Sequence, residues 1–405
     1  MSISHQILIV GGGAAGLATA TSLRKRNASL DIAIVEPADK HYYQPGWTMV
    51  GAGVFNKYET SRDMSSVWPI GVKRIKSEVV AFDPDQNNVT LKDGAIVSYT
   101  TLIVTPGLKL DWDAIEGLNE TLGQNGVTSN YRYDLAPYTW ELVKEMAGKI
   151  AIFTQPSMPI KCAGAPQKAM YLSCDHWMKT GRLKDMNVSF CNAGPVLFGC
   201  APYVPPLMKY VDKYGINLDF GHNFVKIDGP AKTAWFKVTK EGANPEVIER
   251  KFDMIHVCPP QCAPDFIRES ALANAGGWVD VDPATLQHTK FSNIFSLGDV
   301  TSTPNAKTVA AARKQAPIVA ENVISQLAGR ALAPKYDGYG SCPLTVENGK
   351  IILAEFGYGG KVMPTFPWDS TKPRRTAWIL KKSILPKVYW GVMLKGREWL
   401  TNTTI

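Results

Sequence analysis

Cysteines are the side chains in this sequence most able to do redox or nucleophilic chemistry. Seven are spread along the 405 residues: Cys162, Cys174, Cys191, Cys200, Cys258, Cys262 and Cys342. Their odd number and long spacings do not fit the disulfide framework of a small secreted protein. Cys258 and Cys262 form a CxxxC without a second ligand pair nearby, so we expect no metal site.

Cys162 stands where a thiolate would be stabilised. Pro166 favours the first turn of a helix that we expect to run to about Lys179. Cys162 would then lie just before a helix N-terminus with Lys161 beside it, and both features favour the thiolate. The alternative is a small buried side chain, as for most free cysteines. Cys342 lies far along the chain, in a turn-rich segment leading into a strand, so only the tertiary fold could bring the two together.

The N-terminal segment predicts a unit that binds a dinucleotide. An apolar strand at 6–10 runs into glycines at 11, 13 and 16 that fit GxGxxG, and a helix follows to residue 26. Gly11, Gly13 and Gly16, with Ala14 and Ala15 between them, permit a tight turn and close approach of a pyrophosphate to the helix N-terminus. A second strand at 31–35 ends in Glu36, whose carboxylate can accept both hydroxyls of an adenosine ribose.

Two later strand ends favour FAD over NAD. Residues 100–106 are expected to form a strand that includes Thr105 and turns at Gly107, and a strand at 293–299 ends in Gly298 and Asp299. This pairing resembles the flavoprotein superfamily with two dinucleotide domains, in which the late aspartate holds the ribityl chain of the flavin.

A nicotinamide site is not expected. The corresponding mid-chain strand at 149–154 is followed by Gln155 to Pro166, where prolines stand in place of the glycines that a pyrophosphate would need. The electrons should therefore come from a donor other than NAD(P)H.

The segments around the two cysteines resemble the redox motifs of sulfide:quinone oxidoreductases, in particular the type II, mitochondrial-like branch. The resemblance extends over nearly the whole chain. It is carried by residues 161–168 (KCAGAPQK), 336–339 (YDGY), 341–344 (SCPL), 42–48 (YYQPGWT), 275–282 (AGGWVDVD) and 352–356 (ILAEF). No cysteine precedes Cys162, which fits type II and leaves no thiol there for covalent attachment of the flavin.

The resemblance implies a mechanism. Cys162 and Cys342 would be joined by a disulfide or by a trisulfide, and hydrosulfide would attack at Cys342 and leave a persulfide there. Cys162 would face the flavin, and two electrons would pass through FAD to ubiquinone or a similar quinone. A small acceptor such as sulfite, glutathione or cyanide would remove the sulfane sulfur. The resemblance also places Gln44, Pro45 and Val80 at the cofactor.

Other residues carry weaker predictions. Lys307 could stabilise the anion that develops on reduced flavin or on the quinone, or it could be a solvated lysine at a helix start. Phe356, Phe366 and Trp368 could line a quinone pocket, although ordinary core packing is the alternative for each. The remaining five cysteines and His256 are interpreted as core residues.

The C-terminal segment suits a membrane surface. Most of the formal net charge of +8 is concentrated near the C-terminus, where seven basic residues stand against one acid between Arg374 and Thr401. Apolar clusters with Trp and Tyr alternate with these lysines, and Pro386 should divide the segment into two short helices. We expect no signal peptide and no helix that spans a bilayer. An anionic membrane suits this patch better than nucleic acid does.

We therefore expect an α/β protein with two Rossmann-like dinucleotide-binding-type domains and a C-terminal amphipathic, membrane-facing helical segment. The predicted boundaries are 1–110 with 290–335 for the FAD domain, 111–289 for the second domain with the first redox cysteine, and 336–405 for the C-terminal segment. The expected location is the cytoplasmic face of a bacterial inner membrane or the mitochondrial inner membrane. A type II NADH:quinone oxidoreductase and a non-catalytic flavoprotein sensor or scaffold are the alternatives. The sequence does not select the acceptor of the sulfane sulfur or the quinone. It is compatible with a homo-oligomer.

Overall fold

Strand β1 (Ile3–Val10) lies at the centre of a seven-stranded sheet in the computed structural model, which describes residues 3–240 and 242–401. The order is β5-β2-β1-β8-β7-β6, and β19 pairs with β8. The other members are β2 (Ile32–Val35), β5 (Lys73–Ile75), β6 (Val79–Asp83), β7 (Asn88–Leu91), β8 (Ile96–Val104) and β19 (Ile294–Ser296). Strands β5, β2, β1, β8 and β19 run parallel, so their carboxyl ends meet at one edge. The strands expected at both ends of the chain are confirmed.

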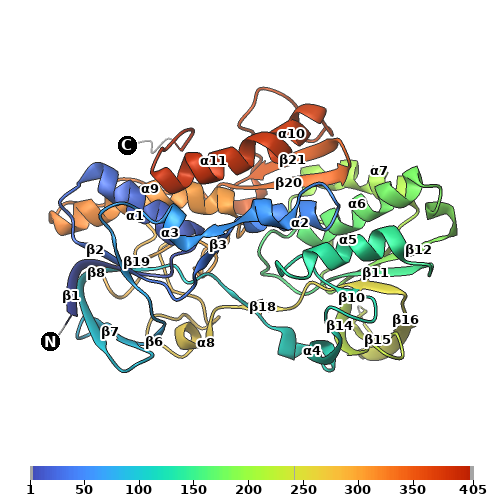
Figure 1. Ribbon diagram of the computed structural model, residues 1–405, viewed down its shortest axis with the longest axis horizontal. Helices are drawn as coiled ribbons and strands as arrows, with labels where there is room; N and C mark the ends of the chain where they lie inside the picture. The colour runs from blue at the N-terminus through green and yellow to red at the C-terminus, as the bar shows by residue number, and fades with distance from the viewer. Residues whose placement is uncertain (1–2, 241, 402–405) are drawn as a thin grey trace.

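Helices from both ends of the chain pack on this first sheet. Helix α1 (Ala14–Arg26) follows β1, and α9 (Val309–Leu327) follows β19; the two helices lie against each other (Figure 1). Because β19 and α9 complete a layer begun by β1 and α1, the first lobe is built from segments far apart in the sequence.

A second, five-stranded sheet forms the other lobe (Figure 1). Its strands all run parallel, in the order β10 (Val127–Thr128), β17 (Met254–His256), β11 (Ile150–Gln155), β12 (Asn187–Asn192) and β13 (Asn217–Phe220). Helices α5 (Ala136–Glu145), α6 (Ala165–Lys179) and α7 (Val204–Tyr214) belong to this lobe, next to an antiparallel sheet of β14 (His222–Asp228), β15 (Thr233–Val238) and β16 (Glu246–Lys251). Helix α6 begins and ends where the sequence predicts, with Pro166 in its first turn.

An antiparallel ribbon of β20 (Gly340–Glu347) and β21 (Lys350–Phe356) joins the lobes, because β20 contacts both α6 and α9. The chain then runs along the upper side in Figure 1 as α10 (Arg375–Ile379), a π-helical turn (Leu380–Ile384) and α11 (Leu385–Gly391). Pro386 lies in the first turn of α11, where its missing N–H is tolerated. The two predicted helical pieces are therefore present, and the π turn connects them directly.

Short elements complete the fold. They are β3 (Lys40–Tyr42), β4 (Ser61–Asp63), β9 (Lys109–Leu110), β18 (Gln261–Cys262), α2 (Trp47–Val50), α3 (Met64–Val67), α4 (Leu118–Thr121) and α8 (Asp265–Arg268). Strand β9 pairs with β18 where the chain crosses between the lobes, and β3 pairs with β4.

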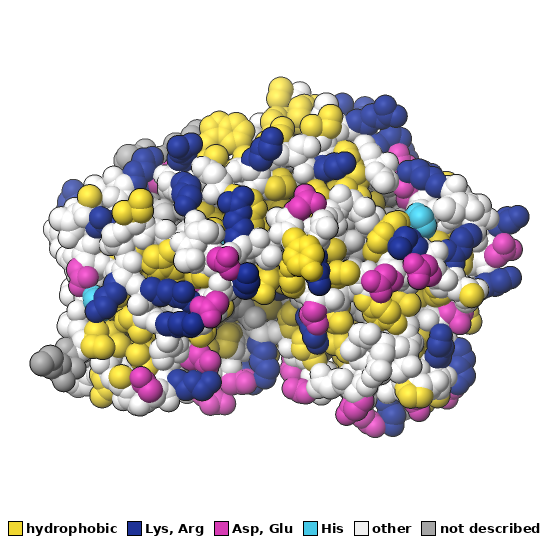
Figure 2. All heavy atoms as spheres, viewed as in Figure 1, with side chains coloured by type: hydrophobic (Ala, Val, Ile, Leu, Met, Phe, Trp, Pro, Cys, Tyr) yellow, Lys and Arg dark blue, Asp and Glu magenta, His cyan; other side chains and the backbone are white. Residues whose placement is uncertain are grey.

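The C-terminal helices have one buried and one exposed side. Trp378, Tyr389 and Trp390 are buried, whereas Ile379 and Ile384 are 54% and 41% exposed. Figure 2 shows hydrophobic and basic side chains side by side along this upper surface. In the part of the chain that the structure describes, no helix is long and apolar enough to cross a membrane.

Candidate active site

The two cysteines singled out from the sequence meet where the lobes join. Their Sγ atoms lie 3.3 Å apart although 180 residues separate them in the chain, and both are free thiols. Cys162 lies in the loop between β11 and α6, and its N–H donates to the carbonyl of Lys307 at 2.9 Å. Its φ of 51° is in the left-handed region, which is strained for a residue with a Cβ. The fold holds this sulfur in place against that strain.

The electrostatic surroundings make the two sulfurs different. The hydrogen bond from Cys342 and the ammonium of Lys168 hold the pKa of Cys162 well below its usual value, against the opposing effect of burial. Lys168 Nζ lies 2.9 Å from Cys162 Sγ. The thiolate of Cys162 and burial together raise the pKa of Cys342. The surroundings therefore favour the thiolate at Cys162 and the thiol at Cys342.

The lysine that lies nearest the thiolate is not the one expected from the sequence. Lys161 donates instead to Gln44 Oε1 at 2.6 Å. Lys168, in the first turn of α6, points back to the sulfur. Its spacing from Cys162 across the start of α6 was a signal available in the sequence, but the sequence analysis gave it no role.

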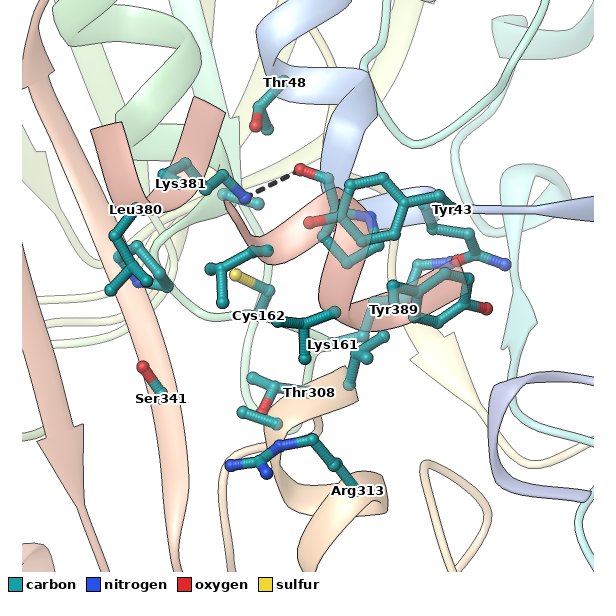
Figure 3. Close-up of a pocket in the computed structure, with 18 of the residues that line it drawn as sticks. Tyr43, Thr48, Lys161, Cys162, Thr308, Arg313, Ser341, Leu380, Lys381 and Tyr389 are labelled. Carbon is teal, nitrogen blue, oxygen red and sulfur yellow. Dashed lines mark hydrogen bonds between the residues drawn. The ribbon is translucent and has the colours of Figure 1, made fainter. Parts of the chain in front are cut away.

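Lys381 was counted in the basic C-terminal segment but is turned inward. It is 3% exposed, and its Nζ donates to the carbonyl of Pro45 at 2.8 Å (Figure 3). Burial, followed by the charge of Lys168, lowers the pKa of Lys381 to about 7. The sequence analysis missed this residue, because the lysines around it do face solvent.

The glycine motif forms a cradle for a dinucleotide. Gly11 has a φ of +96°, and a Cβ there would lie 2.6 Å from the carbonyl oxygen of Thr105. A Cβ at Gly16 would lie 2.0 Å from the carbonyl oxygen of Gly11. Gly13, the N-cap of α1, provides no side-chain cap and has no described atom within 4 Å of a built Cβ. Helix N–H groups thus face open space, as a pyrophosphate requires.

Glu36 lies beside this cradle at the end of β2. Its carboxylate accepts the N–H of Gly12 and that of Ala38, each at 2.7 Å. These bonds orient the carboxylate next to the glycine turn. Its contact with an adenosine ribose stays a prediction.

The late motif meets the early one. Gly298 has a φ of +80°, and a Cβ there would lie 3.1 Å from Cβ of Ala15 at the start of α1. Asp299 follows, and burial raises its pKa. Burial lowers the pKa of Lys307 to about 8; its ammonium donates to Thr301 O at 2.8 Å and lies 4.3 Å from the ring of Trp278. These contacts fit a flavin held between β19 and α9.

A cavity of about 220 Å³ lies beside Cys162 and reaches Asp299, Lys307 and Lys381. Its wall includes several residues predicted from the sequence: Gln44, Pro45, Cys162, Asp299, Lys307 and Phe366. Figure 3 shows Cys162 near the middle, with Lys381, Tyr43, Tyr389, Thr308 and Arg313 around it. Gly107, at the neighbouring strand end, has a φ of +77° and no described atom within 4 Å of a built Cβ.

Polar atoms on this wall lack partners, which supports a bound group. The indole N–H of Trp47, the hydroxyl of Thr48 and the amide of Asn130 are buried and have no hydrogen-bond partner among the described residues. Buried polar groups are costly without a partner. A flavin, which has carbonyl and N–H groups, or a quinone, which has carbonyl groups, fits such a wall.

The β20–β21 ribbon has one cysteine face and one cavity face. Cys342 pairs with Ala354, and Ser341 pairs with Glu355. Side chains alternate along a strand, so Ser341 and Glu355 lie on the face opposite Cys342. Ser341, Pro343, Leu353 and Glu355 all line the cavity, whereas Cys342 lies in the core between the ribbon and α6.

Three of the predicted site residues lie neither on the cavity wall nor at the glycine cradle. Phe356 is on the Cys342 face of the ribbon and packs edge-to-face on Phe198. Trp368 is not among the cavity residues but stacks on Phe366, with ring centroids 4.3 Å apart. Val80 is 45% exposed on β6, away from the cavity wall.

The residues interpreted as core residues are mostly buried. Cys174, Cys191, Cys200 and Cys258 are buried, and Cys262 is half-buried. Burial raises the pKa of Cys258 to about 12. His256 is fully buried and its Nε2 accepts the N–H of Asn130 at 2.9 Å, while burial lowers its pKa to about 3. Burial raises the pKa of all five of these thiols and so favours their protonated form.

The fold and the site together define a flavoprotein of the disulfide reductase class, with a redox cysteine pair beside a dinucleotide cradle. Residues 5–139 match the family described as pyridine nucleotide-disulphide oxidoreductase. The mitochondrial sulfide:quinone oxidoreductase of Dictyostelium discoideum is 45% identical over 98% of this chain and 88% of that protein. The chain therefore belongs to the sulfide:quinone oxidoreductase family.

Solved structures share the fold. The sulfide:quinone oxidoreductase of Aquifex aeolicus gives a TM-score of 0.79 at 19% identity, covering 97% of this chain and 92% of that chain. A chain in the structure of the Tetrahymena thermophila mitochondrial ATP synthase gives 0.85 at 21% identity, covering 97% and 96%. At such identities the likeness concerns the fold alone, and function has to be argued from the site.

Proposed function

We propose that this protein oxidises hydrogen sulfide to sulfane sulfur at the Cys162–Cys342 pair and passes two electrons through FAD to a quinone. The observation that carries the proposal is the contact of these two sulfurs, 3.3 Å apart, beside a buried ammonium and the wall of the cofactor cavity. Membership of the sulfide:quinone oxidoreductase family supports the same reaction.

The different pKa values of the two cysteines set the direction of attack. In the oxidised pair, hydrosulfide attacks the Cys342 sulfur, an S–S bond forms there, and the bond to the Cys162 side breaks. In such exchange the sulfur with the lower pKa leaves faster. Cys162 has that lower pKa and lies beside Lys168, so the electron pair stays on Cys162. Cys342 keeps the persulfide.

The spacing of the sulfurs leaves room for a bridging sulfur. Two S–S bonds of about 2.05 Å that meet at slightly more than a right angle span about 3.3 Å. The two Sγ atoms are 3.3 Å apart. A trisulfide therefore fits the site without movement of either cysteine, whereas a direct disulfide requires the sulfurs to approach.

FAD, when bound, supplies the two-electron carrier between the cysteine pair and the quinone. We assign its pyrophosphate to the turn formed by Gly11, Gly13 and Gly16 and its ribose to Glu36. Asp299 and Lys307 would lie at the flavin end, where Lys307 can place positive charge near an anion that develops on reduction. Val80 of β6, whose side chain is 45% exposed, would complete the set of cofactor contacts.

We place the quinone in the part of the cavity between the ribbon and the C-terminal helices. The apolar residues there are Pro343, Leu353, Phe366, Leu380, Leu385 and Val388. The exposed apolar side chains of α10 and the π turn lie on the same segment as Leu380, so a membrane surface at these helices would supply a long-chain quinone directly. Sulfite, glutathione or cyanide would take the sulfane sulfur on the Cys342 side.

The domain division follows the two sheets. We propose a discontinuous FAD domain of 1–110 and 290–335, a second Rossmann-like domain of 111–289, and a C-terminal segment of 336–405 that docks on a membrane. The parallel strands in each of the two sheets support the first two, and the exposed side of the C-terminal helices supports the third. The name of the Dictyostelium discoideum relative calls it mitochondrial. The inner membrane of a mitochondrion or of a bacterium would suit this arrangement.

The proposal is tested by steady-state reduction of a short-chain ubiquinone analogue, with sulfide and a sulfite acceptor or with NADH as donor. We expect turnover with sulfide only, and loss of that turnover in Cys342→Ser. Cys174→Ser, which changes a buried cysteine away from the pair, is the control. Equal turnover of Cys342→Ser and the wild-type protein would contradict the proposal.

A further inference from the structure

Glu355 is a buried carboxylate on the cavity wall that the reaction described above does not use. It is 3% exposed and lies on the cavity face of the ribbon. Its Oε1 accepts hydrogen bonds from the hydroxyls of Tyr339 and Thr365, and its Oε2 accepts the N–H of Thr365 at 3.1 Å. Such a group is rarely buried in a protein unless it is paired.

Charges surround Glu355 without neutralising it directly. Among the described residues it forms no ion pair within 4.0 Å. Arg313 of α9 is close enough for its charge to act on Tyr339 and Glu355, and burial lowers the pKa of Arg313. Lys314 lies 5.2 Å from the Tyr339 ring, and Asp337 accepts the Tyr339 N–H. The carboxylate is thus fixed in position by hydrogen bonds and is not held in an ion pair.

The hydrogen bonds give Glu355 a connection to solvent. Thr365 is exposed, also lines the cavity, and bonds to both carboxylate oxygens. The ribbon separates this route from Cys342, because Glu355 and Cys342 lie on opposite faces. Protons could therefore reach this side of the cavity without passing the sulfurs.

We propose that Glu355 is a proton-relay residue that supplies one of the two protons needed when a quinone is reduced in this cavity. The inference rests on the proposed function. Reduction of a quinone to a quinol takes two electrons, which come from the reduced flavin, and two protons. One quinol O–H bond forms as the protonated carboxyl of Glu355 loses its proton, and water restores that proton by way of the Thr365 hydroxyl. The second proton comes from water.

The test separates the two half-reactions by rapid mixing of the FAD-loaded protein. In Glu355→Gln, flavin bleaching by sulfide should keep its wild-type rate. Reoxidation of the reduced flavin by a short-chain ubiquinone analogue should slow on the order of a hundredfold, as for loss of a positioned proton donor. The pH dependence of reoxidation should flatten, and Glu355→Asp should recover part of the rate.

Glu347→Gln is the matched control, because Glu347 lies at the other end of the same ribbon and does not line the cavity. It should reoxidise at the wild-type rate. Wild-type reoxidation in Glu355→Gln, or an equal slowing of bleaching and reoxidation, would overturn the relay. Absence of bleaching by sulfide in the wild-type protein would instead overturn the proposed function.

Discussion

Replacement of Lys168 with methionine tests the electrostatic asymmetry of the cysteine pair. The substitution keeps a long apolar side chain in a buried position but removes the ammonium 2.9 Å from Cys162 Sγ. Cys162 keeps its hydrogen bond with Cys342, which is the larger cause of its lowered pKa. The pKa of Cys162 should therefore rise without returning fully to that of an isolated buried thiol.

The size of the rise follows from the strength of the lost contact. A hydrogen bond to a charged group contributes about 1.5–3 kcal/mol. One pKa unit corresponds to about 1.4 kcal/mol, so the pKa of Cys162 should rise by about one to two units. The lowered pKa extends to lower pH the range in which Cys162 is a thiolate in the wild-type protein. As the pH is lowered, Cys162 of Lys168→Met should become protonated at a pH about one to two units higher than Cys162 of the wild-type protein.

Alkylation of the reduced protein by iodoacetamide measures this change, because only the thiolate reacts. The rate at Cys162 is followed by peptide mass spectrometry as a function of pH. Lys179→Met, which removes a charge from the exposed end of the same helix, is the control and should leave the profile in place. An unshifted profile in Lys168→Met would refute the role assigned to this ammonium.

Three further predictions concern the cofactor, a second lysine and the membrane. Gly16→Ala should abolish FAD binding and lower the melting temperature, because the added Cβ would lie 2.0 Å from a backbone oxygen. Gly13→Ala should weaken FAD binding but keep the melting temperature of the apoprotein, because a Cβ there meets no described atom. Thermal melts and the fluorescence of released FAD distinguish the two variants. Burial lowers the pKa of Lys381 to about 7, so its side chain is charged below that pH. Because this charge favours the Cys162 thiolate, the rate of flavin bleaching by sulfide should fall as the pH rises through 7. Lys381→Met should lack this transition. Ile379→Asp should reduce binding to anionic phospholipid vesicles about tenfold or more without changing the bleaching of the flavin by sulfide. Val247→Asp, at a position 63% exposed on β16, should leave vesicle binding unchanged. Co-sedimentation with vesicles measures binding of both variants.

Removal of residues 376–405 would be a poorer test of the membrane segment. Trp378, Tyr389 and Trp390 from this segment are buried, and Tyr389 donates to or accepts from His41 at 2.6 Å. Deletion would expose core on both lobes. A single exposed residue such as Ile379 changes the surface alone.

Local patterns made the cofactor half of the site predictable. The glycine turn, the strand before it and Glu36 lie within one βαβ unit, and their spacing alone fixes which backbone groups meet. The start of α6 was predictable for the same reason, because Pro166 marks the first turn. The partner of β8 from the other end of the chain, β19, was predicted only through the resemblance to flavoproteins.

Tertiary packing decided what the sequence pattern could not. Lys168 and Lys381 approach the cysteines from two helices that are far apart in the chain, and no spacing rule relates them to Cys342. The strand period explains Phe356: it stands one position from Glu355, so its side chain lies on the opposite face of β21 from the cavity. Identifying that face required the register of β20 against β21, which the sequence does not show.

Anaerobic titration of the FAD-loaded protein with sulfide, and separately with NADH, tests the central claim most directly. We predict that sulfide bleaches the flavin absorbance or produces a long-wavelength charge-transfer band, that Cys162→Ser abolishes this response, and that NADH produces none. Bleaching by NADH without a response to sulfide would contradict the account and identify a nicotinamide-driven enzyme.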